Sequence, residues 1–312
     1  MNPKDELAER PNFDVYVSGM NATVRMKWND IEKYIIPGRI IDVGCGTGEL
    51  TKIIAKKFLN SQVIGIDISD YFVQLSRKNT KALENVEIQK CDIVTKKFEP
   101  NSITTKLFSS VIHELASYKG YNREIPKKVI KGSFKELKPG GRIIIRDGVS
   151  PGDYRIYMWL NDKNGINELD HEKNKKLNFK DLSTEARFIR FCMQFKGKEW
   201  DYKTTKIDNK KLYIMDAHFA HEFMSKKEYV ENWDVEALEE FGIFTIEEYK
   251  HILEQVGFDA VEIKIYKNPW IVKNWYEHKL KLFKCENGKL EEVDYFPTNI
   301  VIVGEKPKLA TN

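Results

Sequence analysis

The sequence has few cysteines and no long hydrophobic run. Four cysteines stand far apart among 312 residues, and no two of them form a Cys-x-x-Cys pair. This spacing argues against a zinc site and a disulfide framework, and it fits a reduced compartment. No apolar stretch reaches the roughly 18 residues of a membrane-spanning helix. The N-terminal MNPKDELAER lacks the apolar segment of a secretory signal. We therefore predict a cytoplasmic protein without a membrane partner.

The sequence also has little excess charge of either sign. The 51 basic and 47 acidic residues leave a net charge of +4, and the lysine pairs are interleaved with acidic residues. Proteins that bind nucleic acids concentrate basic charge on one face. The sequence therefore allows a nucleic-acid partner but does not favour one. The length fits one large or two modest domains.

Residues 40–149 alternate between short β-rich runs and helical stretches, which is typical of a parallel sheet with crossover helices. An amphipathic helix over 21–36 precedes them. The expected strands are 39–43, 62–67, 86–92, 103–109 and 142–147. The expected helices are 48–58, 70–82, 111–118 and 124–137.

This alternation stops after Ser150. Residues 151–240 are rich in aromatic and charged residues and show no regular alternation, and the α/β pattern resumes near residue 245. Within this part we expect strands at 155–160, 260–266 and 298–307, helices at 183–195, 216–233 and 245–258, and a hairpin over 279–293 that turns at Asn287-Gly288. The predicted divisions are an N-terminal arm and helix (1–36), a core (37–150), an insertion (151–240), a C-terminal part of the core sheet with an inserted hairpin (241–307) and a frayed tail (308–312).

Three glycines at every second position, Gly44, Gly46 and Gly48, follow the first expected strand in IDVGCGTGEL (41–50). Glycine lets a ligand lie against the backbone, and such a turn after a strand commonly holds a nucleotide. The dinucleotide fingerprint needs a further glycine where Glu49 stands, and a carboxylate there would oppose a pyrophosphate. A Walker loop needs Gly-Lys-Ser/Thr at its end. The turn therefore predicts a ligand with adenosine and no phosphate.

Carboxylates stand at the ends of three neighbouring strands. Asp42 precedes the glycines and can accept from a cationic amino group. Asp67 ends the second strand about 20 positions after Gly48, where a carboxylate can accept both hydroxyls of a ribose. Asp92 ends the third strand, where an adenine would be met. Because open α/β sheets bind ligands at the carboxyl ends of their strands, we expect these groups in one site.

These stretches resemble the class I S-adenosylmethionine-dependent methyltransferases. IDVGCGTGEL resembles the first motif of that family, VIGIDIS (63–69) the second, KCDI (90–93) the third and LKPGGRIIIRD (137–147) the fifth strand with its preceding turn. The resemblance covers 40–150 and extends to 245–307. It implies a Rossmann-like, seven-stranded, mostly parallel sheet with helices on both faces and an antiparallel terminal strand. It also implies S-adenosylmethionine as cofactor and S-adenosylhomocysteine as product.

The resemblance further implies a role for each motif residue. Gly44, Gly46 and Gly48 would lie under the methionine and ribose portions. Asp42 would orient the methionine amino group, Asp67 would hold the ribose hydroxyls, and Asp92 would accept from the adenine amino group. The other predicted cofactor contacts are Cys45 (a packing residue of the turn rather than a reactive thiol), Ile68, Cys91 and Ile93 around the adenine, Ser109 after the fourth strand, and Tyr16 or Arg25 at the methionine carboxylate.

The segment after the fourth strand, FSSVIHEL (108–115), usually faces the methyl group in this family. It lacks the Asn/Asp-Pro-Pro-aromatic motif of nucleobase and protein-amide members and resembles the Ser-x-x-x-His stretch of small-molecule members. His113 is the candidate base, because the unperturbed pKa of histidine lies near operating pH. A capping or packing histidine is the alternative, and Glu114 is the second catalytic candidate.

No metal site is predicted. Ser117 stands where the second histidine of a His-Glu-x-x-His motif would be. His218 and His221 lie three positions apart on one expected helix, without a recognised third ligand. We expect them to pack in the core or to form a wall of the acceptor pocket.

We predict an enzyme that transfers a methyl group from S-adenosylmethionine to a small molecule, with an oxygen or carbon acceptor ahead of nitrogen. The N-terminal arm and the 151–240 insertion would enclose the acceptor, the insertion acting as a lid that excludes water. Two alternatives stay open. One is a methyltransferase of RNA or another macromolecule, and the other is a non-catalytic module that binds S-adenosylmethionine. The sequence predicts neither the acceptor nor the oligomeric state.

Overall fold

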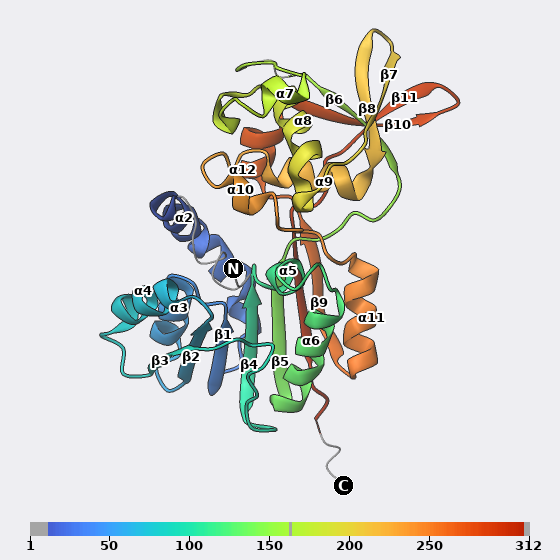
Figure 1. Cartoon of the computed structure of the whole chain (residues 1–312). Coiled ribbons are helices and arrows are strands. Elements are labelled where there is room, and N and C mark those ends of the chain that lie inside the picture. Colours follow the sequence, from blue (N-terminus) through green and yellow to red (C-terminus); the bar gives the residue numbers. More distant parts are fainter. Residues whose placement is uncertain (1–11, 162–163, 309–312) are drawn as a thin grey trace. The chain divides into compact units, whose positions relative to one another are not determined.

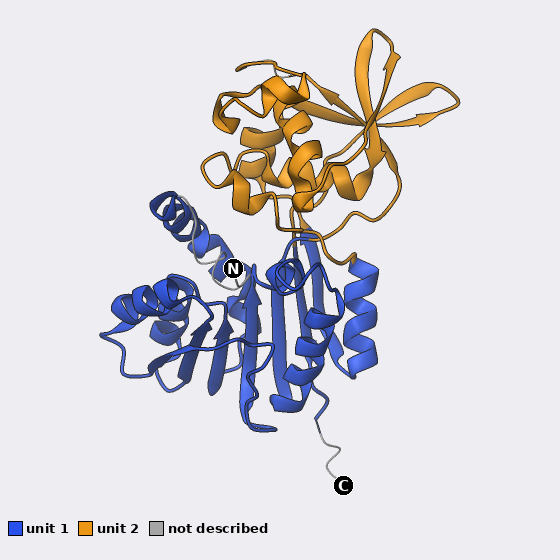
Figure 2. Ribbon diagram, in the orientation of Figure 1, with its two compact units in different colours: residues 1–148, 246–265, 300–312 blue, residues 149–245, 266–299 orange. Residues whose placement is uncertain are grey.

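The computed structural model describes residues 12–161 and 164–308. The chain divides into two compact units (Figure 2). The first unit comprises residues 1–148, 246–265 and 300–312, and the second comprises residues 149–245 and 266–299. The chain therefore passes between the units four times. Of the predicted tail, residues 309–312 lie outside the described part.

A seven-stranded sheet forms the centre of the first unit as far as it is described, with the strand order β3-β2-β1-β4-β5-β12-β9 (Figure 1). Strands β1 to β5 pair in parallel, and β12 pairs antiparallel with β5. The predicted fold class is confirmed. The strands are β1 (Arg39–Val43), β2 (Gln62–Asp67), β3 (Val86–Lys90), β4 (Ile103–Ser109), β5 (Leu137–Asp147), β9 (Asp259–Tyr266) and β12 (Asn299–Glu305).

The central strands are buried because they read as nearly continuous β-branched runs. Ile143, Ile144 and Ile145 of β5 are fully buried in succession, as are residues 300–303 of β12. Such runs are typical of strands that helices cover on both faces. The helices of this unit are α2 (Phe13–Ile31), α3 (Glu49–Lys57), α4 (Asp70–Thr80), α5 (Ile112–Ser117), α6 (Glu124–Glu136) and α11 (Ile246–Val256).

Helices α3 and α4 pack against β2 and β3, and α5 and α6 pack against β5. Helix α2 contacts α3 and β5. It begins at Phe13 and not at residue 21 as expected, so the segment FDVYVSGM (13–20) is helical. No helix in the described ranges is long and apolar enough to cross a bilayer.

The second unit contains a five-stranded antiparallel sheet with the order β11-β10-β6-β8-β7. Its strands are β6 (Arg155–Leu160), β7 (Lys203–Ile207), β8 (Lys210–Asp216), β10 (Leu280–Glu286) and β11 (Lys289–Val293). Its α-helices are α7 (His171–Asn174), α8 (Thr184–Gln194), α9 (Ala217–Lys226), α10 (Trp233–Glu236) and α12 (Pro269–Ile271). The hairpin expected over 279–293 is β10 and β11, and it pairs with β6 of this second sheet.

Aromatic side chains of α8 and α9 fill the core of the second unit. Phe188, Phe191 and Phe223 are fully buried, and the ring of Phe223 is in contact with each of the other two rings. Phe179 stacks on Trp233 with ring centroids 3.8 Å apart. These five residues belong to one cluster of buried hydrophobic side chains, so the aromatic residues of the insertion form the core of the second unit.

The packing at Gly48 yields a stability prediction. Gly48 has a φ of +76°, and a Cβ there would lie 2.7 Å from Ser76 Cβ and 2.9 Å from Ser76 Cα. Gly120 has a φ of +69°, and its added Cβ would meet nothing within 4 Å. Gly120→Ala should lower the free energy of unfolding by the left-handed strain alone, about 1–2 kcal/mol. Gly48→Ala should cost about 1–3 kcal/mol more because of the clash. Denaturant unfolding measures both, and equal losses would contradict the packing argument.

Candidate functional site

A cavity of about 200 Å³ lies at the carboxyl ends of β1, β2 and β4 in the first unit. One water needs roughly 15 Å³ of such space, so the cavity is far larger than a packing defect. Residues of α2, of α5 and of the turn after β3 complete its wall. Of the residues predicted from the sequence, those that line it are Tyr16, Asp42, Gly44, Cys45, Gly46, Asp67, Ile68, Cys91, Asp92, Ile93, Ser109 and Glu114. Gly48, Arg25 and His113 are described and lie outside this lining.

The glycine turn after β1 forms one wall of the cavity. Gly44 and Gly46 have φ values of +66° and +51°. A Cβ at Gly44 would lie 2.7 Å from Val111 Cγ2, so this turn needs a residue without a side chain. Gly48 packs against α4 instead of facing the cavity. Burial raises the pKa of the Cys45 thiol, which keeps it protonated and makes it a packing group.

The carboxylate of Asp67 holds two loops together. Its Oδ2 accepts from the Gly46 N–H at 2.9 Å, and its Oδ1 accepts from the Ser69 N–H at 2.9 Å. Burial raises the pKa of Asp67, and the backbone N–H donors oppose that rise. A carboxylate has about four acceptor positions, so Asp67 keeps capacity for ligand hydroxyls.

Two opposite charges lie at the β1 side of the cavity, on Asp42 and Lys27. Burial raises the pKa of Asp42 to about 6. The Thr51 hydroxyl, which donates to Asp42 Oδ2 at 2.6 Å, and the charge of Lys27 both lower this pKa and only partly offset the effect of burial. Burial and the charge of Arg146 lower the pKa of Lys27 to about 8. Sequence reasoning missed Lys27, because a lysine in an amphipathic helix is usually solvated. The site therefore offers both a carboxylate and an ammonium.

At the β3 side, Asp92 lines the cavity together with Cys91 and Ile93. Its Oδ1 accepts from the Val94 N–H at 2.9 Å, and Lys119 Nζ lies 3.6 Å from its Oδ2. Lys119 also lines the cavity and was not predicted. At this side, a carboxylate can accept a hydrogen bond from an amino group, and apolar side chains can contact the faces of a planar ring.

One face of α2 covers the cavity. Tyr16, Met20, Val24 and Lys27 recur every three or four positions, so their side chains share a face of the helix, and all four line the cavity. Tyr16 also contacts Phe72 of α4, with ring centroids 6.0 Å apart. Arg25, by contrast, is exposed.

His113 and Asp147 form a buried pair beside this cavity. His113 Nδ1 lies 2.6 Å from Asp147 Oδ1. Val111 and Glu114, on either side of His113 in the chain, do line the cavity. Ser109 Oγ is buried in the wall and has no hydrogen-bond partner among the described residues. A ligand in the cavity would supply that partner.

Comparison with known proteins identifies the family. A family model described as a methyltransferase domain matches residues 38–257, well over half of the chain. The chain belongs to the methyltransferase domain family. This confirms the resemblance stated from the motifs, and S-adenosylmethionine is the cofactor of such domains.

The curated relatives of this methyltransferase domain share only part of their length with it. A ribosomal protein L11 methyltransferase of Caldanaerobacter subterraneus is 33% identical over 131 residues, which are 39% of this chain and 42% of the relative. A demethylmenaquinone methyltransferase of Symbiobacterium thermophilum is 28% identical over 155 residues, which are 47% of this chain and 58% of the relative. The chain thus spans about half the length of these relatives.

A solved structure has a similar fold over the whole length. It is one chain of a complex that contains the Trm112 methyltransferase activator of Haloferax volcanii. The TM-score is 0.52 at 12% identity, and the match covers 98% of this chain and 99% of that chain. At this identity the likeness concerns the fold alone.

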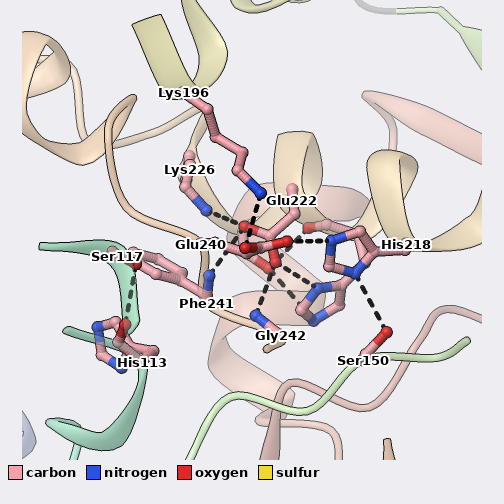
Figure 3. A network of polar contacts seen from close by, with 12 residues as sticks. His113, Ser117, Ser150, Lys196, His218, Glu222, Lys226, Glu240, Phe241 and Gly242 are labelled. Atoms are coloured by element: carbon pink, nitrogen blue, oxygen red, sulfur yellow. Dashed lines mark hydrogen bonds and ion pairs between the residues drawn. The ribbon is translucent and has the colours of Figure 1, made fainter. Parts of the chain in front are cut away.

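The second unit of the methyltransferase contains a buried cluster of charged side chains (Figure 3). Glu222 of α9 is fully buried, and its carboxylate accepts from Lys226 Nζ, from the Phe241 N–H at 2.9 Å and from the Gly242 N–H at 2.7 Å. Burial raises the pKa of Glu222, but the charge of Lys226 and the contacts with His221 and His218 together hold it well below its usual value. The pair therefore fixes the 241–242 turn to α9.

The two histidines of α9 have different surroundings. His218 Nε2 lies 2.9 Å from Glu240 Oε1, and its Nδ1 lies 3.1 Å from Ser150 Oγ. Burial alone would lower the pKa of His218, but the hydrogen bond to Glu240 together with the charges of Glu222 and Glu240 raises it overall. Burial lowers the pKa of His221, which is neutral at pH 7. Their ring contacts and hydrogen bonds fit structural roles.

The buried ion pair yields a second prediction. Lys226→Met leaves the Glu222 carboxylate uncompensated, so the free energy of unfolding should fall by about 3–5 kcal/mol. The double variant Glu222→Gln/Lys226→Met removes that charge and should lose less. As a control, Lys175 forms an exposed pair with Glu172, and Lys175→Met should change stability by less than about 1 kcal/mol. Urea denaturation compares the three, and a loss in Lys226→Met no larger than in Lys175→Met would argue against a structural ion pair.

Proposed function

We propose that this protein transfers a methyl group from S-adenosylmethionine to a small molecule that reacts through oxygen or carbon. The observation that carries the proposal is one buried cavity with an anion and a cation at one side and carboxylates at the other. S-adenosylmethionine has a zwitterionic amino-acid end and a ribose with an adenine at the other, and it has no phosphate. The charges of the cavity match that distribution.

At the amino-acid end, Asp42 would accept from the ammonium of the ligand, and Lys27 would bind its carboxylate. Each ligand group would then meet an opposite charge in a buried place, where such contacts are strong. The glycine turn supports this binding mode. Glu49 begins α3, and Lys52 lies 3.2 Å from it, so the helix terminus that would bind a phosphate already carries a carboxylate.

At the nucleoside end, the Asp67 carboxylate would accept from the two ribose hydroxyls, and Asp92 from the adenine amino group. Cys91, Ile68 and Ile93 would contact the ring faces. Burial raises the pKa of Cys91, so its thiol stays neutral beside the base. Ser109, with its buried hydroxyl, would complete its hydrogen bonding with the ligand.

Two observations favour a small acceptor. The segment after β4 has no Asn/Asp-Pro-Pro-aromatic motif, and one relative is named for demethylmenaquinone, a small molecule. A macromolecular acceptor is the second candidate, because another relative is named for ribosomal protein L11. The second unit would serve as a lid in the first case and as a binding platform in the second.

Methyl transfer is tested with radiolabelled S-adenosylmethionine and a panel of acceptors. Catechol and a menaquinol precursor represent hydroxyl and ring-carbon acceptors, ethanolamine represents amines, and a ribosomal protein–RNA fraction represents macromolecules. Label in the small molecules supports the proposal, and label in the macromolecules alone supports the second candidate. Cofactor binding without any transfer would favour a non-catalytic module.

A third prediction separates the two ends of the ligand. S-adenosylhomocysteine carries the amino-acid group, and 5′-methylthioadenosine lacks it. Lys27→Met should weaken S-adenosylhomocysteine by about tenfold or more, the scale of one charged hydrogen bond, and should leave 5′-methylthioadenosine unchanged. Asp67→Asn should weaken both ligands. Calorimetry measures the four affinities, and equal effects of Lys27→Met on both ligands would refute the assignment of Lys27.

A fourth prediction concerns pH. The ligand ammonium requires an ionised Asp42, whose pKa is about 6 in the free protein. Below that pH, binding must release the proton, so the affinity for S-adenosylhomocysteine should fall up to tenfold per pH unit. Near pH 7 the affinity should be greatest, and above about pH 8 it should fall again, because Lys27, whose pKa is about 8, then loses the proton that the ligand carboxylate requires. Asp42→Asn should bind more weakly and lose this dependence between pH 5 and 7, and a persisting dependence would assign it to another group.

A further inference from the structure

We propose that β9, the strand at one end of the seven-stranded sheet, pairs with β9 of a second copy of this chain. The two strands would run antiparallel about a two-fold axis at Ile263, so that the two sheets join into one. The interface uses no residue that lines the cavity, and the inference therefore does not depend on the proposed function.

The backbone of β9 is suited to accept a further strand. In the described part of the chain, β9 is the last strand at its end of the sheet and has β12 as its neighbour (Figure 1). Such a strand turns a row of backbone N–H and C=O groups away from the sheet, which makes it a template for another strand. Its sequence, DAVEIKIY, has no proline or glycine and is rich in β-branched residues, which favour strand pairing.

The apolar side chains of β9 are more exposed than those of the central strands. Val261, Ile263 and Ile265 stand at every second position, so they share one face of the sheet. Val261 is 41% exposed and Ile265 is 40% exposed, and Ile263 between them is half-buried. The residues of β1, β4 and β12 are, by contrast, nearly all buried. An apolar row thus lies open on the strand that forms the edge.

The strand at the other end of the sheet, β3, is covered by side chains of α4. Arg77 donates from Nε and Nη2 to the Ile88 carbonyl at 3.2 and 3.0 Å. Lys90 and Asp70 form an exposed ion pair beside it. The Ile88 side chain itself is buried. Covering and charging an edge strand are ways in which proteins prevent pairing between sheets. The two ends of the sheet therefore differ, and β9 is the end that presents an open β-branched row.

The alternation of β9 restricts how two copies can pair. Directly opposite residues of an antiparallel pair lie on the same face of the sheet. A register shifted by one residue would set the apolar row of one copy against the polar row of the other. With Ile263 on the two-fold axis, Val261 lies opposite the partner's Ile265, and the two Ile263 side chains lie opposite each other. The exposed apolar surface of both strands is then joined into one row.

The charges on the other face of β9 favour the same register. With Ile263 on the axis, Glu262 lies opposite the partner's Lys264, and the symmetry repeats this pair. An axis at Glu262 would oppose two carboxylates, and an axis at Lys264 would oppose two ammonium groups, which is destabilising. The Tyr34 hydroxyl donates to Glu262 Oε2 at 2.5 Å and so orients that side chain. The segment EIK (262–264) is therefore complementary to itself in one register.

One pair of strands is a small interface. Stable complexes bury roughly 1,200–2,000 Å² of surface, and a single added strand contributes only part of that area. In such pairing the backbone hydrogen bonds provide the affinity, and the alternating side chains provide the specificity. We therefore expect a weak dimer that dissociates on dilution.

Sedimentation equilibrium over roughly 1 to 500 µM protein tests the dimer. The mass of the wild type should approach twice that of one chain as the concentration rises. Ile263→Lys sets two ammonium groups on the axis and should raise the dissociation constant by about tenfold or more. The matched control is Leu59→Lys, since Leu59 is 72% exposed in the turn after α3, and it should behave as wild type. A wild type that stays monomeric throughout overturns the proposal, as does an Ile263→Lys variant that dimerises as well as Leu59→Lys.

Charge reversal tests the register. Lys264→Glu sets a carboxylate opposite the partner's Glu262 and should weaken the dimer. The double variant Glu262→Lys/Lys264→Glu restores opposite charges across the axis and should recover the affinity of the wild type. It also loses the contact of Glu262 with Tyr34, so the recovery could not come from a more stable monomer. A double variant that dimerises no better than Lys264→Glu would refute this register.

A cysteine on the axis gives an independent measurement. In Ile263→Cys the two new thiols lie opposite each other, so mild oxidation should link the two chains by a disulfide. In Val261→Cys the two thiols lie four positions apart along the paired strands, roughly 13 Å, which is too far for a disulfide. The wild type, with its four native cysteines, provides the background. Equal linking of the two variants would place the axis elsewhere and contradict the proposal.

Discussion

The hydrogen bonds of one carboxylate, that of Asp67, organise the candidate site. Parallel pairing brings the ends of β1 and β2 together, and just beyond the paired residues the Cys45 N–H donates to the Ile66 carbonyl at 3.0 Å. Asp67 joins the loops that follow these strands by accepting from the N–H of Gly46 and of Ser69. The glycine turn is thereby held in its left-handed conformation, and the cavity beneath α2 depends on that turn. Asp147 has a similar role at another strand of the same sheet. Its carboxylate accepts from the Ile112 N–H and so joins the end of β5 to the start of α5.

The sequence predicted the sheet well because its strands are β-branched runs bounded by turn residues. The bounds of β1, β2 and β4 agree with those expected. The hairpin of β7 and β8 was missed, because β7 (KTTKI) is mostly polar and β8 (KKLYIMD) does not alternate between polar and apolar residues. Its turn, Asp208-Asn209, has positive φ at both positions, and this pair of Asx residues was the available signal. The predicted start of helix α2, residue 21, lies eight residues after the observed start at Phe13. The first two turns mix aromatic and polar residues, and their helical period was not recognised.

In the site, motif residues were predictable and their partners were not. The glycines and Asp42, Asp67 and Asp92 follow strands, so their place at one sheet edge follows from topology alone. Lys27 lies in a helix that precedes the sheet, and only the packed structure shows which of its faces meets the cavity. The contact of His113 with Asp147 joins residues 34 positions apart. No local pattern contains such a pairing, since the sequence singled out His113 as a candidate base but did not indicate Asp147 as its partner.

The order of the strands has a consequence for how the chain is made. Strand β12 lies between β5 and β9 in the sheet, yet it follows both of them in the chain. All of the second unit is translated between β5 and β12. During synthesis, the edge of β5 that pairs with β12 therefore stays unpaired until β12 has been made. Such an edge is a site of aggregation. The edge of β5 is thus covered only after the whole second unit has been made, although the strands that carry the ligand site precede that unit in the chain.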